Sequence, residues 1–84
     1  MFAVEVRSEN DYGSKAEDAM ARKRADYLAA GTRVVWDVDL LSPDVIKSYD
    51  MNHPNDPKIF RRGDLADAEP AVPGWRISVD ALFT

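Results

Sequence analysis

The chain has 84 residues, a formal net charge of −4 at pH 7 and no cysteine. This length limits it to one small domain, and the missing cysteines exclude disulfides and thiolate metal sites. The negative charge excludes a general attraction to nucleic acid, so any DNA-binding surface must be a local patch. No run approaches the roughly 18 apolar residues that span a bilayer, so we expect no membrane partner. The cysteine-free composition suits the cytoplasm, which is the expected location.

The chain begins with the pattern of a half-buried strand. Residues 2–7 alternate between an apolar face and a face that carries Glu5 and Arg7. Turn-forming residues follow, and Ser14 and Glu17 then match a capping box, in which each side chain bonds the backbone N–H of the other residue. A helix is therefore expected to begin beside Ser14.

The predicted helix runs from about residue 15 to residue 30 and ends at Gly31, which suits a left-handed C-terminal cap. Residues 33–39 are apolar at nearly every position, as in a strand buried on both faces. A strand, a helix and a strand with short connections predict a βαβ crossover with parallel strands.

The second half of the chain predicts antiparallel strands. We expect a third strand over residues 45–50 and a fourth over 58–62, joined by a polar turn at 51–57. Residues 63–74 read as a loop with a little extended structure, and a short strand follows from residue 75. Two hydrophobic residues are then expected to pack back on the core as a lid: Leu82 and Phe83. The fold class is α/β, a mixed sheet with one main helix.

Lys23 lies in the middle of the apolar face of the predicted helix. At about 100° per residue, that face collects five apolar residues: Ala16, Ala19, Met20, Tyr27 and Ala30. Lys23 can cover apolar surface with its stem while its ammonium reaches water. Alternatively, it can project toward a carboxylate on the preceding strand, and such a pair offsets part of the desolvation cost.

Glu5 is the carboxylate that such a lysine would reach. It is either a solvent-facing residue of the sheet or, if the helix covers it, an oxygen ligand for a hard divalent cation. Arg7 shares its face. That arginine can contact a phosphate, or it can form an exposed ion pair that contributes little to stability.

Other polar residues give weaker signals. Asp37 and Asp39 share a face at the end of a strand, where they form either a second acidic cluster or an ordinary exposed strand end. Arg22 and Arg24 flank the apolar helix face and are expected in solvent. His53 stands in a polar turn and is expected to be solvated.

Five sequence blocks occur in a familiar order and spacing over residues 2–83: VEVRSENDYG, KRADYLAAG, VVWDVD, PAVPGW and ALF. Together they resemble the Uma family of restriction endonucleases, within the PD-(D/E)XK nuclease superfamily. The resemblance implies a restriction-endonuclease-like core, metal-dependent hydrolysis of DNA, and Mg²⁺ or Mn²⁺ as the only cofactor.

The resemblance also assigns roles to residues. The family's strand motif matches residues 5–8, so Glu5 falls on the metal ligand, while Arg7 and Ser8 fall on phosphate-contacting or supporting positions. The superfamily's usual lysine position is occupied by Arg7. In the Uma family the catalytic lysine lies on the following helix, four residues before a tyrosine and eight before a glycine. Lys23 and Tyr27 match that spacing, so Lys23 would be catalytic and Tyr27 supporting.

Family members are about twice this length, and their upstream half carries a proline–aspartate motif. No aspartate precedes Glu5 here. We therefore expect residues 1–84 to form a single truncated domain, the C-terminal half of the family fold, which is inactive alone. The alternative is a non-catalytic interaction module that forms a homodimer, since the missing half would leave the first strand with an open edge.

Overall fold

A computed structural model of the chain describes residues 1–7 and 12–83. The elements in this part are β1 (Phe2–Val6), α1 (Ser14–Ala29), β2 (Val34–Val38), β3 (Ile46–Asp50), β4 (His53–Phe60), β5 (Leu65–Ala68), β6 (Val72–Ser78) and the 3₁₀ helix η1 (Val79–Phe83). Four strands form one sheet in the order β1-β2-β3-β4, and β5 and β6 form a second. Neither helix of this described part has the length and apolar character needed to cross a membrane. The fold is mixed α/β, as predicted.

The predicted βαβ crossover is confirmed. β1 and β2 pair in parallel, with Glu5 beside Asp37 in the register, and β2 pairs with β3 in antiparallel fashion. The helix ends where predicted, because Gly31 adopts a φ of 96° and its N–H donates to the carbonyl of Leu28 at 3.1 Å. This left-handed conformation favours glycine over residues with a Cβ.

The predicted capping box at the start of α1 is wrong. Gly13 is the N-cap residue, and it has no side chain to cap the helix. The backbone N–H of Glu17 donates instead to the carbonyl of Gly13 at 2.9 Å. The carboxylate of Glu17 bonds the guanidinium of Arg7, so a tertiary ion pair replaces the expected local cap.

The second half contains more strand than predicted. β4 begins at His53 because the turn before it is short: Asp50 accepts the backbone N–H groups of Asn52 and His53, at 2.8 and 2.9 Å. Residues 65–68 lie in the segment predicted as a loop with a little extended structure, and they form β5 and pair with β6. Leu82 packs against the core as expected, whereas Phe83 is exposed and lies under the guanidinium of Arg62.

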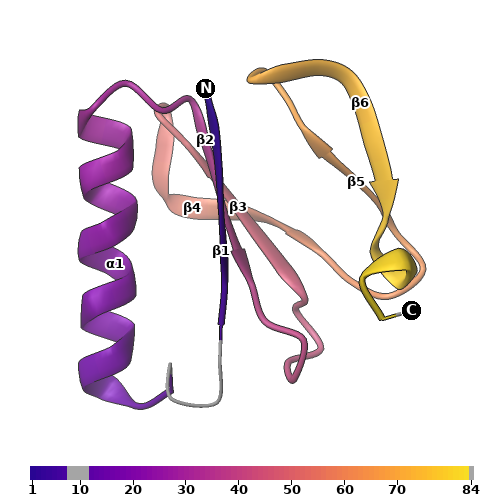
Figure 1. Ribbon diagram of the computed structural model, residues 1–84, viewed down its shortest axis with the longest axis horizontal. Coiled ribbons are helices and arrows are strands. Elements are labelled where there is room, and N and C mark those ends of the chain that lie inside the picture. Colours follow the sequence, from indigo (N-terminus) through magenta and orange to yellow (C-terminus); the bar gives the residue numbers. More distant parts are fainter. Residues whose placement is uncertain (8–11, 84) are drawn as a thin grey trace.

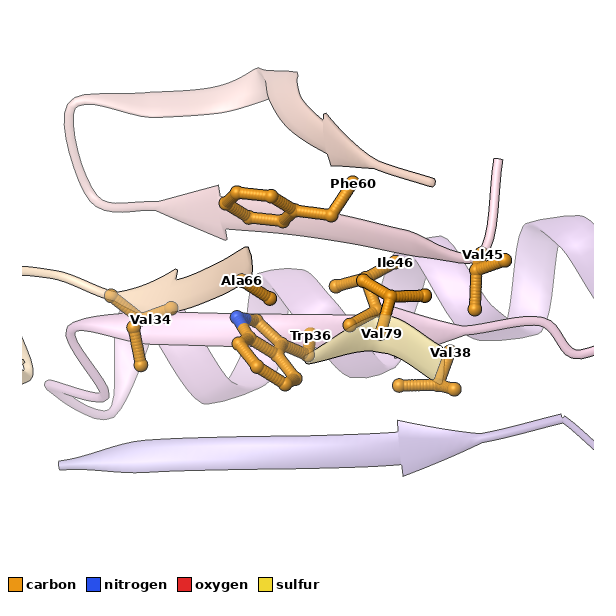
Figure 2. Close-up of a cluster of buried hydrophobic side chains, with 9 residues drawn as sticks. Val34, Trp36, Val38, Val45, Ile46, Phe60, Ala66 and Val79 are labelled. Atoms are coloured by element: carbon orange, nitrogen blue, oxygen red, sulfur yellow. The ribbon is translucent and has the colours of Figure 1, made fainter. Parts of the chain in front are cut away.

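The two faces of the four-stranded sheet are covered differently. Figure 1 shows α1 on one side and the β5–β6 hairpin on the other. The apolar core lies on the hairpin side, where Figure 2 shows Trp36 among aliphatic side chains from β2, β3, β5 and η1. In contrast, Met20 is the only buried residue that α1 contributes within the described chain. Polar side chains fill much of the remaining helix–sheet interface.

Candidate functional site

Glu5, Lys23 and Tyr27 meet on the helix side of the sheet. The Tyr27 hydroxyl donates to Oε1 of Glu5 at 2.8 Å, and Lys23 Nζ lies 3.5 Å from Oε2. The Glu5 side chain is 21% exposed, so α1 covers most of it, which is the condition that the metal-ligand interpretation required. The hydrogen bond to Glu5 raises the pKa of Tyr27, which keeps this hydroxyl protonated as a donor.

The prediction that Lys23 lies in the middle of the inward face of α1 is wrong. Its side chain is 59% exposed, and its ammonium reaches Glu5 from the margin of the interface. Ala19 and Ala30, which helped to define the predicted apolar face, are exposed. The inward face instead contains Met20 and Arg24.

The most buried polar contact of the interface joins Arg7 to Asp37. Arg7 Nε donates to Oδ1 at 2.8 Å and Nη2 donates to Oδ2 at 2.7 Å, so the guanidinium holds both carboxylate oxygens. The two side chains are only 5% and 3% exposed. Hydrogen bonds from Arg7 to Asp37, and then to Glu17, raise the pKa of Arg7. Arg7 is therefore not an exposed ion pair, and a phosphate would have to compete with two carboxylates for it.

Asp37 and Arg24 both depart from prediction. Asp37 is buried rather than an exposed strand end, and Arg24 turns toward the sheet rather than solvent. Nη1 of Arg24 lies 3.8 Å from Asp37 Oδ2, and its guanidinium carbon lies 4.1 Å above the ring of Tyr49. The sequence did carry a signal for Asp37, because an aspartate inside a strand buried on both faces requires a partner.

His53 is exposed, as predicted, with Nδ1 3.1 Å from Asp50 Oδ1. Trp36 fills the core, while Tyr27 is only half-buried over the sheet. Ser8, the remaining predicted site residue, lies outside the described residues.

The described residues can supply one carboxylate to a metal ion at this place. Glu5 is partly accessible, but its cross-strand neighbour Asp37 already accepts two hydrogen bonds from Arg7. Across residues 1–7 and 12–83, no group of three or more histidine, cysteine or acidic side chains could hold a metal. As a hard oxygen donor Glu5 fits a divalent cation as a single ligand, and a cation held there would need further oxygens from elsewhere.

No family model, no curated protein and no solved structure matches this chain. The resemblance to the Uma family therefore remains a prediction from the five sequence blocks. What each residue can do is therefore inferred from its own contacts, described above.

Proposed function

We propose that this chain supplies part of a metal-dependent nuclease site of the Uma type, on a restriction-endonuclease-like fold, and does not cleave DNA alone. The observation that carries the proposal is the meeting of Glu5, Lys23 and Tyr27, the three residues that the resemblance selects. They come from two consecutive elements, β1 and α1, and their contacts at 2.8 and 3.5 Å bring them to one place. We also propose a cytoplasmic location, because the chain contains no cysteine.

The chemistry of the three side chains suits hydrolysis of a phosphodiester. A divalent cation, when bound, supplies Lewis-acid chemistry to such a reaction, and the Glu5 carboxylate is a suitable hard oxygen ligand for Mg²⁺ or Mn²⁺. Tyr27 orients that carboxylate through its hydrogen bond. The exposed ammonium of Lys23 can turn toward a substrate phosphate and stabilise the negative charge that develops there.

One carboxylate also explains why the chain should be inactive alone. Mg²⁺ takes about six oxygen ligands and usually keeps several waters, so a single protein ligand gives weak binding. Further carboxylates must come from another polypeptide segment, which would also contribute to the DNA-binding surface. The net charge of −4 agrees with the need for another segment at the DNA-binding surface, because it gives this chain no general attraction to nucleic acid.

Metal binding by the chain can be measured without activity. Mn²⁺ added at increasing concentration should broaden the backbone amide resonances around Glu5 through its unpaired electrons. Glu5→Gln should abolish this broadening, whereas Asp18→Asn, a change at an exposed helix residue, should leave it intact. Equal broadening in the chain and in Glu5→Gln would refute the role of Glu5.

Catalysis can be measured in a fusion that places the upstream half of a Uma-family endonuclease before Met1. We expect this fusion to nick supercoiled plasmid DNA with Mg²⁺ or Mn²⁺. Lys23→Met should abolish nicking, while the matched change Lys15→Met on the same helix should not. Activity that survives Lys23→Met would contradict the catalytic assignment.

A second candidate function is protein association without catalysis. The observation that favours it is the position of β1 at the edge of the sheet. Two residues of this strand, Val4 and Val6, have exposed side chains. In this role the chain would bind a second copy of itself, and the polar contacts between α1 and the sheet would only stabilise the fold.

A further inference from the structure

The two edges of the four-stranded sheet differ in their protection. β4 carries Pro54 and Pro57, exposed polar residues and an irregular register with β3, all of which discourage pairing with another strand. β1 contains no proline, and its charged residue Glu5 turns toward α1. Within the described chain β1 pairs only with β2, so its outer edge can accept another strand.

The hydrogen bonds of β1 identify which backbone groups face that edge. The N–H of Arg7 donates to Val38, and the carbonyl of Met1 accepts from Arg33, so odd-numbered residues direct their backbone groups toward β2. Because this direction alternates along a strand, the backbone groups of Phe2, Val4 and Val6 point outward. The Val4 and Val6 side chains are also 48% and 59% exposed.

We propose that β1 pairs with β1 of a second copy in antiparallel fashion, with Val4 of each chain opposite Val4 of the other. This inference rests on the association role proposed above and specifies its partner and its surface. The pairing joins two four-stranded sheets into one continuous sheet. It covers the exposed valines on one face and satisfies the outward backbone groups of both strands.

The charge pattern of β1 selects this register. With the two-fold axis at Val4, all five β1 residues find partners: Phe2 faces Val6 of the second copy, and Ala3 faces Glu5. A shift that centres the pairing on Glu5 places two carboxylates directly opposite, which is unfavourable. A shift that centres it on Val6 leaves Val6 as the only β1 residue opposite another β1 residue. The register at Val4 thus combines the longest pairing with no opposed like charges.

The dimer would also change the surroundings of Glu5. Both Glu5 side chains would lie on the helix face, and each would be the diagonal neighbour of the other across the new strand pair. Diagonal residues lie about 7–8 Å apart, so the second copy would bring a second carboxylate near a site that holds one.

Cysteine substitution tests the register directly, because the chain has no cysteine of its own. Residues opposite each other in a hydrogen-bonded antiparallel pair have Cα atoms about 5.5 Å apart, which suits a disulfide. Val4→Cys should therefore give a disulfide-linked dimer on oxidation under native conditions. Val6→Cys is the matched control on the same strand and face, and it should remain a single chain, because four residues of offset place the two sulfurs too far apart.

Sedimentation velocity provides the second measurement. The unmodified chain should have the mass of two chains, and so should Leu65→Lys, a charge placed on an exposed residue of β5. Val4→Lys should have the mass of one chain, because two ammonium groups would oppose each other at the two-fold axis. If circular dichroism shows that Val4→Lys does not fold, the comparison of Val4→Cys with Val6→Cys still tests the pairing.

The outcomes separate the inference from the function on which it rests. A monomeric unmodified chain would overturn both the association role and this pairing. A dimer that persists in Val4→Lys, or that cross-links through Val6→Cys rather than Val4→Cys, would overturn the pairing and leave the association role standing.

Discussion

Replacing Asp37 by asparagine is expected to destabilise the protein strongly. The change keeps the size of the side chain but removes the charge that faces Arg7. Since the Arg7 side chain is 5% exposed, its guanidinium cannot turn to water without moving α1 or β1. The carboxylate of Glu17 still bonds the Arg7 guanidinium from the exposed side, so the positive charge of Arg7 keeps one partner.

The expected loss follows from this burial. Removing one partner of a buried ion pair costs about 3–5 kcal/mol, and the remaining contact with Glu17 places the loss near the lower value. Domains have a stability of about 0.05–0.15 kcal/mol per residue, which is about 4–13 kcal/mol for a chain of this length. The substitution should therefore remove a quarter or more of the free energy of unfolding.

Urea unfolding followed by the fluorescence of Trp36 and Trp75 measures this loss. Asp44→Asn is the matched control, because its pair with Arg61 at 2.8 Å lies on the surface and should cost at most about 1 kcal/mol. The double change Arg7→Met with Asp37→Leu removes both charges and should recover most of the stability. If Asp37→Asn costs no more than Asp44→Asn, the buried pair does not hold the helix against the sheet.

The helix and its ends give three further expectations. Lys23→Met should change the free energy of unfolding by no more than about 1 kcal/mol, because the lysine is mostly exposed; a loss of about 3 kcal/mol would instead make it a structural partner of Glu5. Gly31→Ala should cost about 1–2 kcal/mol in the same unfolding experiment, since φ is 96° there. The hydrogen bond from Arg7 lowers the pKa of Glu17, so its stabilisation is complete above about pH 4.3 and is lost as the pH falls through the lower folded-state pKa. The urea midpoint should accordingly decline in acid, and less so in Glu17→Gln.

Local patterns predicted the elements where one signal dominated. Alternation placed β1, Gly31 fixed the end of α1, and the apolar run from residue 34 placed β2. β5 was predicted only as a little extended structure within a loop, because residues 65–68 contain two alanines, one aspartate and a single large apolar residue, Leu65. Its pairing with β6 is a tertiary effect that a local window does not contain.

The contact of Lys23 with Glu5 was one of two predicted alternatives, but the position of Lys23 at the exposed margin of the helix–sheet interface was not predicted. The predicted apolar face of the helix includes Ala19 and Ala30. Because alanine occurs readily on either side of a helix, these two residues place the apparent centre of the face too close to Lys23. Leu28, which is half-buried, lies on the other side of Met20 and would have moved the centre toward Arg24. The ion pair of Arg7 with Asp37 joins residues 30 positions apart, and their partnership depends on the parallel register.

The difference between the two sides of the sheet determines which part of the fold should open first. The hairpin side is held by a continuous apolar cluster, whereas α1 contributes Met20 as its only buried residue in the described chain and is otherwise held by polar contacts. Such contacts have a smaller net effect than apolar burial because both partners lose hydration. Native-state hydrogen exchange should therefore show that amides of α1 open at a lower free energy than those of β2 and β3. Asp37→Asn should lower the opening energy of α1 more than that of β5 and β6, and equal opening energies for α1 and β2 would show that helix and sheet unfold as one unit.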